Sequence, residues 1–374
     1  MQKIIIIGAG ILGASTAYHS AKLGAVVTLV DRSDTGQATD AAAGIVCPWL
    51  SQRRNKAWYQ LAKGGARYYP ELIAQLEADG ERDTGYQQVG AISLHTEMNK
   101  LEQMAERARK RREDAPEIGE ITILSPTETK QLFPPLSEQY GSVHVSGGAR
   151  VKGSALRDSL IRAAKKNGVT VVNGNASLVM EGNQVLGIKT EDKMYCADQV
   201  IVTAGAWSRE LLQPLGVQFL VKPQKAQIVH LELPGTDTSH WPVVMPPQNH
   251  YILTFDNGRV VVGSTHENEA GFDTRVTAGG MNEILSKALE VAPGLSACTY
   301  LETRVGFRPF TPGFLPVIGA LQGFEGIYVA NGLGASGLTS GPYLGAELAK
   351  FVLGNHTEID PINYNVEGAL SPEA

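Results

Sequence analysis

The chain has 374 residues, of which 43% are hydrophobic and 19% are charged, and its formal net charge is −5. This length allows two domains with separate cores, and the acidic balance gives no reason to expect a nucleic-acid partner. The three cysteines are widely spaced and predict no disulfide framework, and no apolar run approaches the length of a membrane span.

The first predicted elements are a buried strand, a glycine turn, a helix and a second strand that ends in an acid. In order they are the apolar run at 3–7, the turn with Gly8, Gly10 and Gly13, the helix at 14–23, the strand at 25–30, and Asp31. Gly8 permits the tight turn, Gly10 lets backbone approach a pyrophosphate, and Gly13 lets the helix lie close to the strand. We expect Asp31 to accept the hydroxyls of an adenosine ribose, although the neighbouring Arg32 leaves a 2′-phosphate open. This order is the dinucleotide-binding fingerprint in its structural context.

The next segment, 41–46, is rich in small residues that allow close approach of a flat ligand or begin a packed helix. The pattern of apolar residues then predicts helices at 57–78, 153–167, 280–292 and about 342–353. The segment 100–114 is dense in opposite charges and has few apolar residues, which predicts a solvated helix face. Alternating or continuous apolar runs predict strands at 86–95, 169–172, 176–180, 185–190, 227–233, 250–255 and 259–264, and a strand running into a glycine turn at 199–207.

Parallel α/β pieces therefore alternate along the chain with antiparallel, β-rich pieces. We expect an α/β protein in which a Rossmann-like domain is interleaved with a smaller antiparallel β-rich domain that takes the substrate. The expected segments are 1–84, 147–220 and 305–374 for the first domain, and 85–146 and 221–304 for the second. Because Met1 to Lys3 leads directly into a core strand, no removable signal is expected. We expect a cytoplasmic protein, with a peripheral position on a membrane and the oligomeric state left open.

Glycine turns follow three predicted parallel strands, at the edge where open α/β sheets bind their ligands. In the third turn, 326–337, the amides around Gly337, Leu338 and Thr339 are suited to face the N1–C2=O edge of a flavin, which becomes negative on reduction. A glycine-rich connection without a ligand is the alternative.

Arg308 stands among apolar and proline residues, where burying a guanidinium is costly, and its position predicts contact with an anion. The alternative is an internal ion pair, which fits Arg304 better because Glu302 lies two residues before it.

Together these motifs resemble the FAD-dependent D-amino acid oxidase superfamily, which includes glycine oxidase, sarcosine oxidase and D-amino acid dehydrogenase. The resemblance is carried by the fingerprint with Asp31, the segment 39–44, the turn at 202–207, Arg308-Pro309 with 316–319, and the turn at 326–337. It implies FAD as cofactor and requires no metal. Because the loop at 38–44 has no histidine and the last turn no cysteine, the FAD is expected to be non-covalent.

Carried across residue by residue, the resemblance implies a set of cofactor contacts. They are Gly8, Gly10, Ile11, Leu12, Gly13, Asp31, Arg32, Thr39, Ala43, Gly44, Ile45, Val172, Ala204, Gly205, Trp207, Gly332, Gly334, Ser336, Gly337, Leu338 and Thr339. Some members carry a second arginine or a histidine in the last turn, where this chain has Leu333 and Ala335, so its polar contacts to substrate differ.

The resemblance also implies a reaction. Arg308 sits where glycine oxidase-like members bind the substrate carboxylate, and Tyr251 is similar to a tyrosine that helps to hold it, with a packed strand aromatic as an equal reading. The implied activity is oxidation of the CH–NH bond of a small D-, N-methyl or glycine-like amino acid to an imine, by hydride transfer to flavin N5. Oxygen, a quinone or another electron-transfer partner would be the acceptor.

Two other functions stay open from the residues alone. One is an FAD-dependent 2-hydroxy acid dehydrogenase, and the other is a non-catalytic dinucleotide-binding or electron-transfer subunit. Roles for Cys47, His250 and His266 are undecided: Cys47 fits an inert buried thiol better than a redox group, and each histidine fits an ordinary surface position better than a substrate contact.

Overall fold

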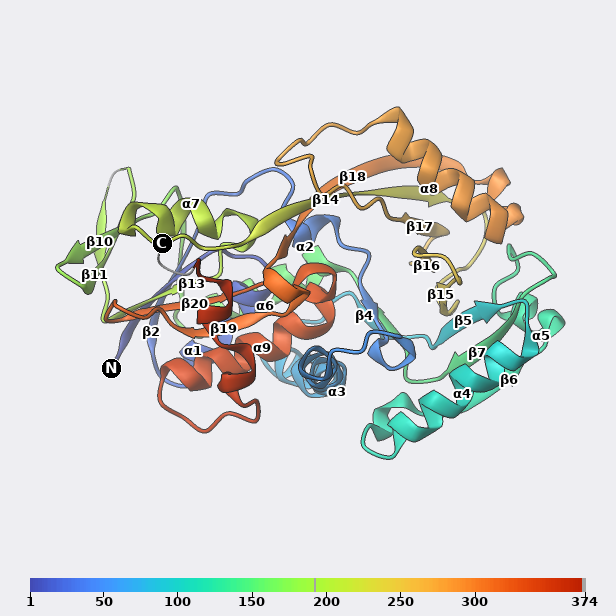
Figure 1. Cartoon of the computed structure of the whole chain (residues 1–374), viewed down its shortest axis with the longest axis horizontal. Coiled ribbons are helices and arrows are strands. Elements are labelled where there is room, and N and C mark those ends of the chain that lie inside the picture. Colours follow the sequence, from blue (N-terminus) through green and yellow to red (C-terminus); the bar gives the residue numbers. More distant parts are fainter. Residues whose placement is uncertain (192, 372–374) are drawn as a thin grey trace.

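The computed structural model describes residues 1–191 and 193–371, and a six-stranded sheet forms one half of the molecule (Figure 1). The strand order is β19-β20-β13-β1-β2-β9, and all neighbours are parallel except β19 and β20. The strands are β1 (Lys3–Ile7), β2 (Val26–Asp31), β9 (Thr170–Asn173), β13 (Gln199–Val202), β19 (Val317–Ala320) and β20 (Ile327–Asn331). The isoleucines of β1 are all buried, as a central parallel strand requires.

Four helices gather beside this sheet: α1 (Ile11–Lys22), α3 (Lys56–Ala78), α6 (Gly153–Lys166) and α9 (Gly337–Val352). Helix α1 packs against α6 and α9, and α9 packs against α3. Glycines make the contacts of α9 close, because a Cβ on Gly345 would lie 2.6 Å from the Cβ of Ser15, and one on Gly65 would lie 2.1 Å from the Thr339 carbonyl oxygen.

An eight-stranded sheet forms the other half, in the order β18-β14-β17-β16-β15-β5-β7-β6. Its strands are β5 (Ala91–His95), β6 (Ile121–Leu124), β7 (Gly141–Val145), β14 (Lys222–Glu232), β15 (Val243–Met245), β16 (Tyr251–Thr254), β17 (Arg259–Gly263) and β18 (Thr299–Phe310). Helices α4 (Met98–Arg112), α5 (Pro126–Leu132) and α8 (Ala278–Val291) pack against it. The long strands β14 and β18 run from this sheet towards the six-stranded one (Figure 1).

The remaining strands form two three-stranded sheets. One is the meander of β10 (Ser177–Glu181), β11 (Gln184–Lys189) and β12 (Met194–Cys196), and the other combines β3 (Ile45–Val46), β8 (Ala149–Val151) and β4 (Tyr86–Gln88). The short helices α2 (Ala38–Ala41) and α7 (Ser208–Leu212) follow β2 and β13. The buried Arg150 of β8 binds the Ser239 carbonyl at 2.8 Å and Asp256 at 3.2 Å, which ties the second small sheet to the eight-stranded sheet.

The expected α/β class is confirmed, and two local expectations need correction. The predicted strand at 86–95 is two strands in different sheets, because Val89 and Gly90 both donate to the Gly148 carbonyl and Gly90 has a φ of +77°. The last helix begins at Gly337, since its sixth residue, Pro342, removes only one internal hydrogen bond.

The division into two domains stays a prediction, and residues 372–374 of its last segment lie outside the described residues. None of the helices in the described part of the chain combines the length and apolar character that a membrane crossing requires.

Candidate active site

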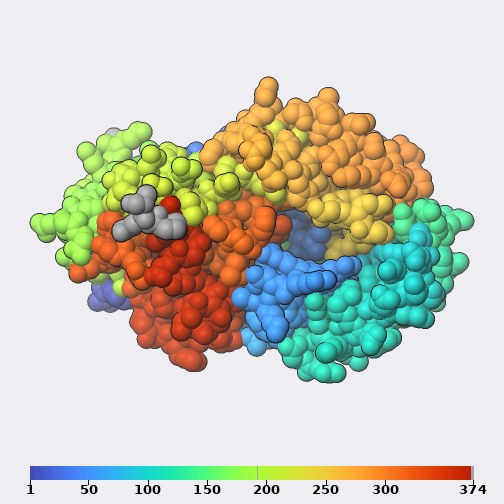
Figure 2. Space-filling view, in the orientation of Figure 1, coloured from blue at the N-terminus to red at the C-terminus, as the bar shows by residue number. Residues whose placement is uncertain are grey.

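A cavity of about 870 Å³ lies where the two large sheets meet. Its wall includes the glycine turn after β1 on one side and residues of β16 and β18 on the other. Figure 2 shows this face hollowed near its middle, between blue segments from the first part of the chain and yellow to orange segments from the second half. This size and mixed origin are typical of a site for a large organic ligand.

The turn between β1 and α1 is locked by the protein itself. Gly8 has a φ of +105°, and the Thr203 hydroxyl lies 2.9 Å from its carbonyl oxygen. A Cβ on Gly13 would lie 1.8 Å from that same oxygen, so Gly13 is required for packing and does not line the cavity. Gly10 does line it, and a Cβ there would meet no protein atom closer than 3.4 Å. The free space at Gly10 therefore fits a ligand that approaches the backbone, as a pyrophosphate does.

Asp31 lies at the end of β2 and on the cavity wall, as expected. Its carboxylate accepts hydrogen bonds from the amides of Ala9 and Ser33, both at 2.6 Å, and from the Gln37 side chain at 2.9 Å. A carboxylate has about four acceptor positions, so these bonds leave about one for a ribose hydroxyl rather than the expected pair. Asp31 therefore also orders the glycine turn.

Arg32 also lines the cavity, but two acids neutralise it. Its guanidinium binds Glu210 through two hydrogen bonds of 3.0 Å and Asp34 at 2.5 Å. These acids hold the pKa of Arg32 above its ordinary value. This arrangement leaves no unpaired charge for a 2′-phosphate and fits an unphosphorylated adenosine ribose.

The remaining expected cofactor residues divide into two groups. Those on the cavity wall are Ile11, Leu12, Thr39, Ala43, Gly44, Ile45, Ala204, Gly205, Trp207, Gly332, Gly334, Gly337, Leu338 and Thr339. Val172 and Ser336 are not on it. Val172 pairs with Val30 inside the sheet, and the Ser336 hydroxyl accepts from the Trp58 indole at 2.9 Å. The chain that follows β9, 174–178, lines the cavity in place of Val172.

The first turn of α9 closes the cavity at the third glycine turn. Gly337, its first residue, is on the wall, and a Cβ there would have no atom within 4 Å. The Thr339 hydroxyl donates to the Ile45 carbonyl at 2.8 Å, which joins this turn to the segment after α2. A long helix therefore presents its N-terminal amides at the cavity, and such a terminus stabilises a developing negative charge.

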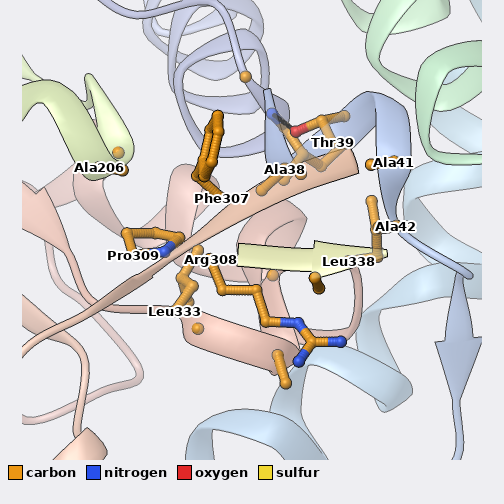
Figure 3. Close-up of a pocket in the computed structure, with 18 of the residues that line it drawn as sticks. Ala38, Thr39, Ala41, Ala42, Ala206, Phe307, Arg308, Pro309, Leu333 and Leu338 are labelled. Atoms are coloured by element: carbon orange, nitrogen blue, oxygen red, sulfur yellow. Dashed lines mark hydrogen bonds between the residues drawn. The ribbon is translucent and has the colours of Figure 1, made fainter. Parts of the chain in front are cut away.

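Arg308 is a half-buried cation on the wall of this cavity. Figure 3 shows Phe307 and Arg308 leaving opposite faces of β18, with the Arg308 side chain extending on the side where Leu338 lies. Its guanidinium donates to the Gln224 side-chain oxygen at 3.0 Å and to the Ser264 hydroxyl at 2.6 Å. Burial lowers its pKa, and among the described residues no carboxylate forms an ion pair with it. A guanidinium on a cavity wall that has no carboxylate partner is suited to bind an anion.

Tyr251 of β16 lies beside this guanidinium. Burial raises the pKa of the phenol, against smaller opposite effects of Arg308 and Ser264, so the hydroxyl is protonated at neutral pH. Gly263 makes room for it, since a Cβ there would lie 2.8 Å from the Tyr251 hydroxyl. The phenol and the guanidinium can therefore donate hydrogen bonds to the same anion.

Cys47, His250 and His266 also line the cavity. Burial raises the pKa of the Cys47 thiol to about 12, so it stays protonated at neutral pH. His250 is 7% exposed, neither of its ring nitrogens has a hydrogen-bond partner in the described protein, and burial lowers its pKa to about 4. His250 is therefore a neutral imidazole on the wall, whereas His266 is exposed.

Gln224, Ser264 and Thr203 were missed by the sequence reasoning. Gln224 reaches Arg308 because the two residues are paired across β14 and β18, 84 positions apart. No local pattern encodes that register. Thr203 had a signal, because it directly precedes the second glycine turn, but its bond to Gly8 depends on β13 lying beside β1.

Three comparisons with known proteins agree with this site. Residues 3–351 match the family model DAO, described as FAD dependent oxidoreductase. The chain is 66% identical to the uncharacterized oxidoreductase YurR of Bacillus subtilis (strain 168), over 99% of this chain and 100% of that protein. It is 29% identical to the glycine oxidase of Pseudomonas aeruginosa, over 99% of this chain and 100% of that protein. A crystal structure of iminodiacetate oxidase from Chelativorans sp. BNC1 superposes with a TM-score of 0.94 at 46% identity, covering 97% of this chain and 98% of that one.

Proposed function

The chain belongs to the DAO family of FAD-dependent oxidoreductases, and from that premise we propose that it oxidises the CH–NH bond of a small glycine-type amino acid to an imine. The single observation that carries the proposal is Arg308, a half-buried guanidinium that has no acidic partner in the described chain and faces the cavity. A carboxylate is the substrate group that such a guanidinium binds through two parallel hydrogen bonds.

The proposed role of the chain is to position the substrate. Gln224 and Ser264 fix the plane of the Arg308 guanidinium, and Tyr251 adds a second donor to the same carboxylate. When bound, FAD supplies the acceptor for a hydride equivalent from the α-carbon. The amine nitrogen loses a proton to water, so a C=N bond forms. Because only a neutral amine can release the hydride, positioning matters more than a strong base.

The names of the relatives support a glycine-type substrate. Iminodiacetate is a glycine whose nitrogen carries a second carboxymethyl group, and glycine is the unsubstituted member of the same class. The protein whose name specifies iminodiacetate is 46% identical to this chain, and the one whose name specifies glycine is 29% identical. We therefore infer that secondary amines with a carboxymethyl group are the first substrates to test. We also propose that the FAD is held without a covalent bond.

The test is an anaerobic titration of the purified holoenzyme, followed by the flavin absorbance near 450 nm. Iminodiacetate, sarcosine, glycine, D-alanine, D-proline and lactate would be added separately. We expect bleaching with at least one glycine-type amine and none with lactate. Bleaching by lactate alone would favour a 2-hydroxy acid dehydrogenase, and no bleaching by any compound would favour a non-catalytic subunit. Readmitting oxygen, or adding a quinone without oxygen, then identifies the acceptor.

A further inference from the structure

A second cavity, of about 490 Å³, lies between the start of α3 and helix α4. Five cationic residues line it: Arg53, Arg54, Lys56, Arg107 and Arg111. Within the described part of the chain, no aspartate or glutamate is on its wall. This concentration of positive charge occurs in a protein whose net charge is −5, so it is a local feature and not a reflection of the composition.

Hydrogen-bond donors on this wall lack acceptors. The Nε and Nη2 atoms of Arg107 and the hydroxyl of Tyr59 are buried and have no hydrogen-bond partner in the described protein. Leaving a buried donor unsatisfied is unfavourable, and more so for a charged group. All three groups can donate, so a ligand that satisfied them would have to carry acceptor oxygens.

The neighbouring charges increase the demand for an anion. Arg111 donates to the carbonyl oxygens of Trp49 at 2.5 Å and Ser51 at 2.7 Å, and its guanidinium lies 4.6 Å from the centre of the Tyr59 ring. These partners hold Arg111 in place but leave its charge uncompensated. Burial, and then the charge of Arg111, lower the pKa of Arg107.

The nearby acids lie outside the wall of this cavity. Asp114 and Glu117 influence Tyr59, but neither lines the cavity, and Asp114 is paired with Lys63 at 2.8 Å.

The cavity also receives the positive end of a long helix. Helix α3 has 23 residues and begins at Lys56, after Asn55, whose side chain accepts from the Trp58 amide at 2.9 Å. Its N-terminal dipole adds to the field of the side chains. Gln52 lines both this cavity and the larger one, and Met104 and Arg107, one turn apart on α4, line the larger and the smaller cavity respectively.

We propose that this basic cavity is a second binding site, which takes a small polyanion carrying carboxylate or phosphate groups. The ligand's oxygens accept from Arg107 and Tyr59, and its remaining charge is balanced by Arg53, Arg54 and Lys56. This site is separate from the substrate carboxylate site at Arg308, and it does not depend on which substrate the enzyme oxidises.

Isothermal titration calorimetry on the holoenzyme tests the proposal, with citrate and inorganic phosphate as probes at matched ionic strength. We expect a saturable heat for at least one probe, weakened about tenfold or more in Arg107→Gln, because a hydrogen bond to a charged group is lost. Lys56→Gln, at the exposed edge, should weaken binding about two- to fivefold. The matched control is Arg109→Gln, an exposed arginine of α4 that is not on the wall.

The probes also distinguish the ligand class, since stronger binding of citrate indicates a polycarboxylate and stronger binding of phosphate a phosphorylated compound. The proposal is overturned if neither probe binds the unchanged holoenzyme at probe concentrations up to about 10 mM. It is equally overturned if Arg109→Gln weakens binding as much as Arg107→Gln does. Since Arg107 is unpaired, Arg107→Gln should retain the thermal stability of the parent, which separates loss of binding from loss of folding.

Discussion

Arg308 is a half-buried charged side chain that two neutral partners, Gln224 and Ser264, hold in place. Replacing it with alanine should lower kcat/KM by about two to three powers of ten, because truncating one member of a buried charge pair costs about 2–5 kcal/mol. Steady-state kinetics on a glycine-type amine would measure the loss. The FAD content of the variant, read from its visible absorbance, should be unchanged.

Arg304 provides the matched control for that experiment. It lies on the same strand four residues earlier, binds Glu302 at 2.7 Å and the Asp40 carbonyl at 3.1 Å, and is not on the cavity wall. Arg304→Ala should therefore keep kcat/KM within about threefold of the parent. If both substitutions reduced activity equally, Arg308 would have no specific role in holding the carboxylate.

His19 makes stability depend on pH. Its Nδ1 donates to the Ser15 carbonyl at 2.7 Å, so its Nε2 accepts from the Tyr68 hydroxyl at 2.6 Å, and burial lowers its pKa from 6.5 to about 4. A folded pKa below the unfolded one means that this contribution is complete above pH 6.5 and is lost as the pH falls towards 4.

At pH 5 the contribution of His19 to the free energy of unfolding should have fallen by about 2 kcal/mol. Urea unfolding at pH 7.5 and pH 5 measures it, and His19→Gln should reduce the difference between the two pH values by that amount. The exposed His356 is the control, because His356→Gln should leave the difference as it was. An unchanged difference in His19→Gln would contradict the assignment.

Single residues of the site were predictable where their own neighbours in sequence made them unusual. Arg308 stands out among apolar residues and prolines, and the ion pair of Arg304 with Glu302 was expected and is confirmed. Val172 was expected among the cofactor contacts; it pairs with Val30 inside the sheet and is not on the cavity wall, where the residues that follow β9 lie. The path of the chain after β9 depends on tertiary contacts, and these cannot be read from the spacing of residues in the sequence.

At the scale of elements, the crossing of α1 and α9 depends on a glycine. A methyl group on Gly345 would overlap Ser15, so Gly345→Ala should destabilise the protein by about 1–3 kcal/mol through overpacking. Because the first turn of α9 lines the cavity, the affinity for FAD should fall as well. Urea unfolding and FAD titration measure the two effects.

Gly279 in α8 gives the comparison for that substitution. It is also helical, but a Cβ there has no atom within 4 Å. Gly279→Ala should therefore stabilise the protein by about 0.5–1 kcal/mol, because alanine loses less backbone entropy in a helix. A destabilised Gly279→Ala with a neutral Gly345→Ala would refute the packing argument.

The elements themselves were largely predictable because their apolar periodicity is strong. The helix expected at 153–167 and the strand expected at 3–7 lie at those positions to within a residue. The division of 86–95 into two strands was not predictable, because it follows from hydrogen bonds to the Gly148 carbonyl, nearly sixty positions later in the chain. Sheet order and register have the same origin, since they are set by pairing between distant segments.

At the scale of the whole molecule, the large cavity lies between the two large sheets, and residues of both line it. Its wall combines the Gly8 turn of one sheet with Arg308 and Tyr251 of the other, so a ligand that filled the cavity would contact both halves. Removing FAD should lower the free energy of unfolding by about 2.7 kcal/mol, relative to holoenzyme in which the free FAD concentration is a hundred times its Kd. Differential scanning calorimetry of the deflavinated protein should record a lower Tm, and re-addition of FAD should restore it. An apoprotein with the same Tm as the holoenzyme would contradict this.

The order of strands in the six-stranded sheet has a consequence for synthesis on the ribosome. The sheet takes β1 from residues 3–7 but is complete only when β20, Ile327–Asn331, has been made. At about 5–20 residues per second, the nascent chain exposes its first apolar strand for roughly 20–60 seconds before the last parallel strand exists. During that interval the buried isoleucines of β1 lack part of their final cover, so we expect the partly synthesised chain to be prone to aggregation and to benefit from chaperones.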